Sequence, residues 1–458
     1  MKMKKRLLSW CLAVVLACSV FSGCSTPADD NGNSGSGEPV QNEPVVQNEP
    51  SNQAENPQNT ASFTAVNGEV KEIAGERSRS DEEIGKNYSE FSLNLLKAGL
   101  AECKDGNYMV SPASLLFALN MAALGAEGDT YTEMTNVYAE GASKKDIAEF
   151  SKNMMETLEK SGQVGVANSL WINSDKPYRA DESYLNLIRQ YYSASGAQLS
   201  FGENPEELCG IINCWIKEKT KGMLENVLDK IEPDAFMYIV NALAFEGKWK
   251  EEYQEYQITN NRNFKDAYGK QQSMKSLNST ETTYLSYGGA KGFMKDYEGG
   301  ELAFVTILPE DESISLDEFF SKQDSDFWTA YYNSRSNEDV ITVTPAFKFD
   351  YGTEMQEILK KMGMNLAFTE EADFSGMIND EDNGQLMISR VIHKTHIELD
   401  ETGTKAAAAT IIEMEDGCAE PFEPVEIKEV ILDRPFAFAI VNKTTGLPIF
   451  MGVVNTLA

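Results

Sequence analysis

The chain has 458 residues, of which 41% are hydrophobic and 24% are charged, a composition typical of a globular protein with a large core. Its formal net charge of −32 argues against nucleic acid, heparin-like polyanions or an acidic membrane surface as a direct partner, because like charges repel. We interpret the acidity as a contribution to solubility.

The N-terminus has the pattern of an export signal. Residues 1–6 are basic, residues 7–20 are almost wholly apolar, and Cys24 follows two small residues. Because the apolar run is too short to cross a bilayer, we predict a signal peptide over residues 1–23. Its ending is similar to a bacterial lipoprotein cleavage site, which implies that Cys24 is the lipid anchor and that the folded part is exported to the cell surface. A simple signal peptide without a lipid is the alternative.

Residues 24–84 are rich in Asn, Pro, Glu and Gln and contain a ragged Glu-Pro-Val repeat. Such a segment buries too little apolar surface to offset the entropy of ordering, so we expect a disordered tether. A coil of this length has a root-mean-square reach of about 40–50 Å. The tether would therefore hold the folded part near a membrane, with the lipid as its sole membrane contact.

Residues 85–458 contain no second linker, internal repeat or later transmembrane run, so we expect one domain. The pattern predicts helices and strands in mixed order. The expected helices are 88–100, one beginning at Pro112 after the capping residue Ser111, 211–222 and 353–362. The expected strands are 166–173, 239–245 running on to Trp249, 302–309 and 340–349.

Sequence patterns of catalysis are lacking. The two histidines, His393 and His396, are three residues apart and would point to opposite faces of a strand, so they make a poor metal pair. No nucleophile elbow, phosphate loop or dinucleotide fingerprint occurs. We therefore expect neither an enzyme, nor a metal site, nor a cofactor.

The stretch from Glu401 to Thr410 combines a glycine with a run of alanines. Read with a period of two, one face carries small and then apolar side chains, which are Thr404, Ala406, Ala408, Thr410, Ile412 and Met414. Such a segment can be exposed as a loop, and it can also be inserted between two strands. The alternative is an ordinary surface helix over 405–415, because alanine favours helices.

Several separated motifs resemble the serpin family in the right order. They are the Glu401-x-Gly403-Thr404 hinge with its alanines, Val391-Ile392-His393-Lys394, Arg434-Pro435-Phe436, Phe450-Met451-Gly452 and the block from Asn107 to Ala126. The resemblance covers residues 85–458. It implies an α+β serpin fold with three β-sheets, eight or nine helices and an exposed reactive-centre loop.

The resemblance also implies a function. Serpins trap a serine protease, or sometimes a cysteine protease, as a covalent acyl-enzyme when the cleaved loop inserts into the main sheet. It assigns the hinge to Glu401, Gly403, Thr404, Ala406, Ala407, Ala408 and Ala409. It assigns a polar cluster beneath the sheet opening to Ser111, Ser114, Asn241 and His393, and the top of that opening to Trp249. We expect the domain to act as a monomer.

The family's spacing from the hinge places the cleaved bond at Gly417–Cys418, although the stretch from Glu401 to Pro435 looks several residues longer than usual. A bond at Cys418-Ala419 would suit an elastase-like pocket that takes small side chains, Asp416-Gly417 an aspartate-directed protease, and Met414 or Phe422 a chymotrypsin-like one. We rank an elastase-like or subtilisin-like target first. No Lys or Arg lies between Thr410 and Ile427, which argues against a trypsin-like target. The alternative function is a non-inhibitory serpin that acts as a surface-tethered binding module or decoy substrate.

Overall fold

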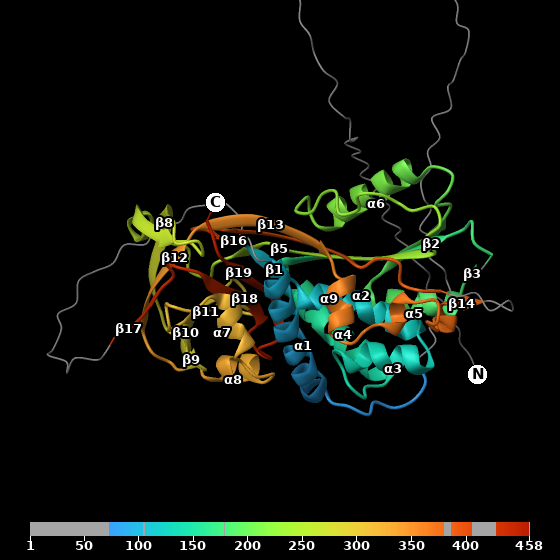
Figure 1. Ribbon diagram of the computed structural model, residues 1–458, viewed down its shortest axis with the longest axis horizontal. Coiled ribbons are helices and arrows are strands. Elements are labelled where there is room, and N and C mark those ends of the chain that lie inside the picture. Colours follow the sequence, from blue (N-terminus) through green and yellow to red (C-terminus); the bar gives the residue numbers. More distant parts are fainter. Residues whose placement is uncertain (1–72, 104–105, 178, 380–385, 405–426, 458) are drawn as a thin grey trace, which may run out of the picture. The chain divides into compact units, whose positions relative to one another are not determined.

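The computed structural model describes residues 73–103, 106–177, 179–379, 386–404 and 427–457 (Figure 1). These residues form nine α-helices and three short 3₁₀-helices among nineteen strands. The α-helices are α1 (Asp81–Glu102), α2 (Pro112–Gly125), α3 (Gly128–Asn136), α4 (Lys144–Ser161), α5 (Glu182–Tyr192), α6 (Pro205–Lys219), α7 (Leu316–Ser321), α8 (Phe327–Asn333) and α9 (Gln356–Lys361). None of the helices in these ranges is long and apolar enough to span a membrane.

Two large sheets carry most of the C-terminal half. The six-stranded sheet has the order β1 (Tyr108–Val110), β19 (Pro448–Val454), β18 (Phe436–Asn442), β11 (Leu302–Pro309), β10 (Ala290–Asp296) and β9 (Tyr284–Tyr287). The four-stranded sheet has the order β17 (Lys428–Ile431), β12 (Val340–Pro345), β8 (Gln271–Glu281) and β7 (Ile258–Lys265). All residues of β11 and β19 are buried, so the six-stranded sheet forms the centre of the main core.

A third sheet layer is divided in two. One part has the order β4 (Ser195–Leu199), β2 (Val164–Asn173) and β5 (Met237–Phe245), and the other pairs β13 (Phe347–Glu354) with β15 (Ile392–Leu399). β5 and β15 lie side by side, but their described residues form no ladder with each other. We call this boundary the seam. Among the described residues, neither of the two strand edges that face each other across the seam is paired with the other.

Two small strand pairs complete the described sheets. β3 (Arg179–Ala180) pairs with β14 (Ile378–Asn379), and β6 (Gly247–Lys248) pairs with β16 (Gly403–Thr404). β6 follows β5 after one residue, and β16 follows β15 after a short turn. The second pair therefore lies at the end of the seam.

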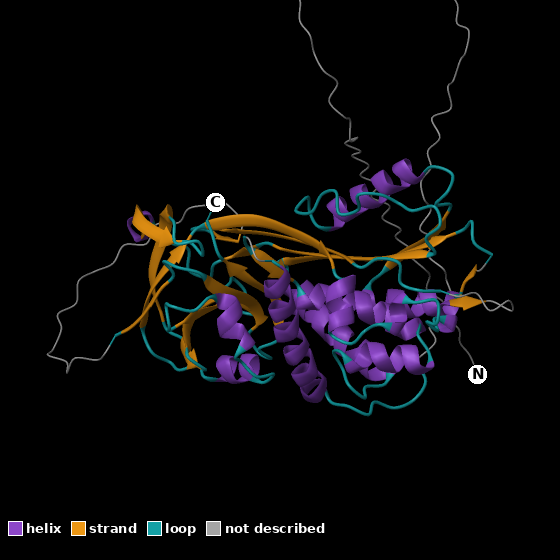
Figure 2. Cartoon of the chain, viewed as in Figure 1, coloured by secondary structure: helices purple, strands orange, loops and turns teal. Residues whose placement is uncertain are grey.

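Helices cover the two faces of the divided layer unequally. Figures 1 and 2 show α6 on one face of β2 and β5, with α2 to α5 on the other. On the α6 face, a separate apolar cluster includes Trp171 of β2, Val240 of β5 and Trp215 of α6. On the α2 face, Leu243 and Phe245 of β5 belong to the main core. Alternate residues of β5 therefore point to different cores, which follows from the two-residue period of a strand.

The second helix begins where the sequence predicts. Pro112 occupies its first turn, and the Ser111 Oγ accepts a hydrogen bond of 3.1 Å from the Ser114 N–H. Every residue of α2 is buried. A helix that is apolar around its whole circumference belongs in a core, and α2 lies beneath the divided layer.

The first helix begins earlier than the expected Tyr88. Ser80 and Glu83 form a capping box, in which the Ser80 N–H donates to Glu83 Oε2 at 2.8 Å and the Glu83 N–H donates to Ser80 Oγ at 3.3 Å. Residues 73–84 are therefore structured, although the composition of the segment predicts a tether as far as residue 84.

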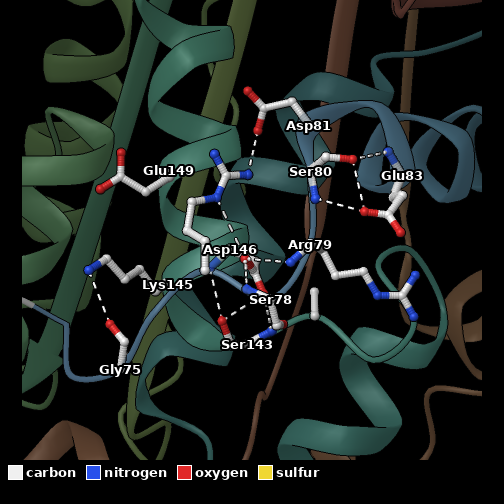
Figure 3. Close-up of polar contacts among 12 residues, drawn as sticks. Gly75, Ser78, Arg79, Ser80, Asp81, Glu83, Ser143, Lys145, Asp146 and Glu149 are labelled. Carbon is white, nitrogen blue, oxygen red and sulfur yellow. Dashed lines mark hydrogen bonds and ion pairs between the residues drawn. The ribbon is translucent and has the colours of Figure 1, made fainter.

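The buried carboxylate of Asp146, on α4, binds the residues that precede α1 (Figure 3). The Asp146 side chain is fully buried and accepts five hydrogen bonds, from the N–H and Oγ of Ser78, the N–H of Arg79, and the N–H and Oγ of Ser143. Burial opposes ionisation, but these hydrogen bonds outweigh it and hold the pKa of Asp146 well below its usual range. Composition does not predict this contact, because Ser78 and Arg79 lie 68 and 67 positions from Asp146 in the sequence.

Candidate functional site

The N-terminus of α2 is bonded to both sides of the seam. The Ser111 N–H donates to Nε2 of His393 on β15 at 3.0 Å, and the Ser114 Oγ donates to Oδ1 of Asn241 on β5. The Asn241 Nδ2 in turn donates to Oδ1 of Asn168 on β2. All five side chains are buried. We call these five residues the seam cluster.

His393 is the only titratable side chain of the seam cluster. Burial alone lowers the pKa of His393 to about 4, because a charged imidazolium loses its hydration inside the core. The neutral ring is also the form that can accept the Ser111 N–H at Nε2. His396 lies on the opposite, half-exposed face of β15 and pairs with Asp350 at 2.7 Å, as the strand period predicts.

Trp249 lies at the end of the seam, directly after β6. Its ring stacks on Tyr297, with centroids 4.6 Å apart, and its Nε1 donates to the Asp400 carbonyl at 3.0 Å. The buried Lys295 ammonium lies 4.5 Å from the centroid of Tyr253 and 5.6 Å from that of Trp249. Trp249 is therefore rigidly held, and it supports the turn that follows β15.

Asp400 builds that turn. Its Oδ1 accepts from the Thr402 N–H at 2.8 Å, from the Thr402 Oγ1 at 2.7 Å and from the Gly403 N–H at 3.2 Å. The Asp400 N–H donates to the Gly403 carbonyl at 2.9 Å, which closes a two-residue reversal. The chain therefore leaves β15, turns, and runs back in the opposite direction.

The hinge residues continue from this turn as strand β16. Gly403 pairs with Lys248 and Thr404 pairs with Gly247 in antiparallel register. Gly403 has a φ of +153° and is buried, and a Cβ at this position would lie 2.2 Å from the Gly247 carbonyl oxygen. Glycine is required here because no larger residue fits against the β6 backbone.

Glu401 ties the same turn to the four-stranded sheet. Its carboxylate forms an ion pair of 2.5 Å with Lys275 of β8. Partial burial opposes ionisation, but the hydrogen bond from Lys275 outweighs it and lowers the pKa of Glu401. The Glu401 carbonyl also accepts from the Tyr253 N–H at 2.9 Å.

The predicted site residues thus fall into two groups. The structure brings Ser111, Ser114, Asn241 and His393 together. It also bonds Trp249 to Asp400 and Thr402, in the turn that contains the hinge residues Glu401 and Gly403 and leads to Thr404. Cys24, Ala406, Ala407, Ala408, Ala409, Gly417 and Cys418 lie outside the described residues. The part that each residue plays in loop insertion stays a prediction.

Sequence reasoning missed three members of the site. They are Asn168, which extends the seam cluster to β2, Asp400, which forms the turn, and Lys275, which pairs with Glu401. Asp400 had a local signal, because an aspartate followed two residues later by a threonine and then a glycine favours an Asx turn. The other two contacts join residues 73 and 126 positions apart.

The described residues hold no group of three or more His, Cys, Asp or Glu side chains that could bind a metal ion. The arrangement around the seam consists of buried hydrogen bonds and aromatic contacts. Such contacts fix the positions of the β5 and β15 edges that face each other across the seam.

Comparisons with known proteins agree with this architecture. A family model described as serpin (serine protease inhibitor) matches residues 86–457. An uncharacterized serpin-like protein of Methanosarcina mazei is 30% identical over 356 residues, which cover 76% of this chain and 81% of that protein. The leukocyte elastase inhibitor of Bos taurus is 29% identical over 398 residues, which cover 82% of this chain and all of that protein.

Among solved structures, the thermophilic serpin tengpin in its native state is similar to this chain. The TM-score is 0.76 at 34% identity, and the match covers 85% of this chain and 98% of tengpin. The predicted α+β fold is thereby confirmed. Because the family match spans the helices, the sheets and the hinge alike, the chain belongs to the serpin family, whose members are generally serine protease inhibitors rather than enzymes.

Proposed function

We propose that this serpin inhibits an elastase-like or subtilisin-like serine protease as a suicide substrate. The protease attacks the carbonyl of Gly417, Cys418 leaves as a new N-terminus, and an acyl-enzyme forms on the arm between the hinge and Gly417. The arm then enters the seam and carries the protease with it. The observation that carries this proposal is β16, whose two residues run antiparallel to β6 at the end of the seam.

The register of β16 supports the way in which the arm would enter. If it continues without a bulge, the even-numbered arm residues face the main core: Ala406 opposite Phe245, Ala408 opposite Leu243, Thr410 opposite Asn241 and Met414 opposite Met237. Small side chains come first, and Thr410 meets the polar seam cluster. The order of side chains along the arm therefore suits the residues of β5 that they would face after insertion.

Insertion must also break bonds. A new strand separates its neighbours by about 4.8 Å on each side, so β15 has to move away from β5. α2 is bonded to His393 on one side and to Asn241 on the other, so it cannot keep both bonds. The seam cluster therefore supplies a barrier that keeps the native sheet unfilled until the loop is cut.

The gain on insertion is larger than inhibition needs. At about 1 kcal/mol net per ladder hydrogen bond, an arm that fills the seam gains on the order of 10 kcal/mol, before burial of side chains is added. Slowing deacylation tenfold takes only about 1.4 kcal/mol. Part of this gain is enough to deform the acyl site of a bound protease.

The target class is supported by the loop sequence and by a relative. Gly417 and Cys418 are small, and the segment between Thr410 and Ile427 has no Lys or Arg for a trypsin-like pocket. The bovine relative is named as an inhibitor of leukocyte elastase. We further propose that the domain acts from the cell surface, held through Cys24 and the tether.

A protease panel tests the proposal. The domain from residue 73 onward is mixed with an elastase, a subtilisin, a chymotrypsin and, as the negative control, trypsin. We expect a protease–serpin band that survives denaturant with elastase or subtilisin, and cleaved protein that melts tens of degrees higher than intact protein. Clean nicking, full remaining protease activity and an unchanged melting temperature would overturn the proposal and favour a decoy substrate or binding module.

A further inference from the structure

A buried ion pair lies next to the rings that support the hinge turn. Lys295 belongs to β10 of the six-stranded sheet, and Glu281 is the last residue of β8 in the four-stranded sheet. The Lys295 Nζ donates to Glu281 Oε1 at 2.8 Å, and the two side chains are only 6% and 14% exposed. The pair therefore joins the two large sheets at a point that water hardly reaches.

The Lys295 ammonium lies against two aromatic rings at once. It is 4.5 Å from the ring centroid of Tyr253 and 5.6 Å from that of Trp249. The two rings meet edge to face, with their centroids 6.4 Å apart. The π face of an aromatic ring attracts a cation, and the attraction is stronger where water is excluded. One buried charge therefore fixes the positions of both rings.

Both ring residues are bonded to the hinge turn. The Trp249 N–H donates to the Thr402 carbonyl at 3.1 Å, and the Tyr253 N–H donates to the Glu401 carbonyl at 2.9 Å. The bond from the Trp249 Nε1 to the Asp400 carbonyl is the third contact. The turn leads directly into β16, which pairs with β6. The positions of the two rings therefore determine whether β16 lies against β6.

The four-stranded sheet in turn fixes Glu281. The Ser279 Oγ donates to the same Glu281 oxygen at 2.6 Å and lies 2.8 Å from Oγ1 of Thr342 on β12. β12 also pairs with β17, the first described strand after β16. Because the carboxylate has a fixed place, the Lys295 ammonium cannot leave the rings without breaking an ion pair inside the protein.

We propose that Lys295 and Glu281 are positioning residues for inhibition, because their ion pair keeps the two rings, and through them β16, in the paired arrangement before the loop is cut. This inference rests on the proposed function in taking strand entry from β16 as the step that competes with hydrolysis of the acyl-enzyme. Entry then begins from a strand that is already paired with β6. The ion pair itself adds little to the stability of the fold, since the desolvation of two buried charges offsets most of their attraction.

A double variant, Lys295→Met with Glu281→Gln, separates this role from stability. It removes both charges at nearly constant volume, and the amide oxygen can still accept from Ser279. The melting temperature should stay close to that of wild type. Strand entry should slow about tenfold, the equivalent of about 1.4 kcal/mol of barrier, so that more serpin molecules are cleaved for each protease inactivated.

The matched control is Lys360→Met on α9. The Lys360 ammonium also lies over an aromatic ring, 5.8 Å from the centroid of Phe368, and it also pairs with a carboxylate, that of Glu357, at 3.1 Å. This lysine takes no part in the contacts of the hinge turn. The control should therefore consume as many serpin molecules for each protease as wild type does.

Hydrogen exchange supplies a second readout, without a protease. The backbone amides of Trp249 and Tyr253 donate to the hinge turn, so they should exchange faster in the double variant than in wild type or the control. If the double variant does not fold, Ser279→Ala is used in its place. It removes only the hydrogen bond that orients Glu281, and it should shift both readouts in the same direction.

The inference requires both changes. Faster exchange with a wild-type stoichiometry, a raised stoichiometry with wild-type exchange, or no change in either would overturn this inference alone. If wild type forms no covalent complex with any protease of the panel, the proposed function is overturned, and the exchange of the Trp249 and Tyr253 amides still decides whether the ion pair holds the hinge turn.

Discussion

Replacing Gly403 with alanine should turn the inhibitor into a substrate. The added Cβ would lie 2.2 Å from the Gly247 carbonyl oxygen and 2.6 Å from the Lys248 Cα, both backbone atoms that cannot turn aside. β16 must therefore separate from β6, and the arm loses the pairing from which its entry begins.

The magnitude follows from the contacts that are lost. Loss of the two-residue β16–β6 pairing at about 1 kcal/mol net, with about 1–2 kcal/mol for alanine at positive φ, gives about 2–3 kcal/mol. If this cost appears in the barrier to insertion, entry slows roughly 30- to 150-fold. Hydrolysis of the acyl-enzyme then overtakes insertion.

The assay is a titration of protease with serpin, which measures how many serpin molecules are consumed for each protease inactivated. Gly403→Ala should raise this stoichiometry steeply while the rate of loop cleavage stays near that of wild type. Gly269→Ala is the matched control, because Gly269 also has a positive φ, of +80°, but open space around its Cβ position. A wild-type stoichiometry for Gly403→Ala would refute the reasoning.

Three further predictions follow from the site. The folded pKa of His393 is lowered, so its contribution to stability is complete above pH 6.5 and is lost as the pH falls towards about 4, by about 3 kcal/mol in all. Urea unfolding at pH 7 and pH 5 should show about 2 kcal/mol of this loss in wild type and less of it in His393→Gln. Lys275→Ala should free Glu401 and speed the uptake of a synthetic peptide with the sequence from Thr404 to Met414 a few-fold on a native gel, and a slower uptake than wild type would contradict the role of this ion pair. Asp146→Asn should cost about 2–4 kcal/mol, seen as a lower melting temperature, because an amide cannot accept all five hydrogen bonds; an unchanged melting temperature would argue that the contact is unimportant.

Local patterns predicted the parts of the site that depend on local physics. The cap of α2 at Ser111 and the opposite faces of His393 and His396 follow from hydrogen bonding at helix ends and from the strand period, and the structure confirms both. Family motifs also selected the four polar residues that meet beneath the seam.

Local sequence patterns do not predict the long-range contacts. Asn168 and Asn241 meet because β2 pairs with β5 in one register, and a register is set by the packing of the whole sheet. The seam itself has no sequence signal, since β5 is as apolar as a fully paired central strand. Apolar periodicity does not predict the start of α1, because the first turn of the helix is polar and begins at the capping box of Ser80 and Glu83.

The hydrogen bonds to Asp146 also determine which helix first bears a force applied to the chain before α1. Ser78 and Arg79 are bound by a carboxylate that belongs to α4, so tension on the preceding chain loads that helix before it loads α1. The bonds share the force because they converge on one side chain. A force applied to the chain before α1 would therefore have to break the hydrogen bonds to Asp146 before it could unfold the first turn of α1.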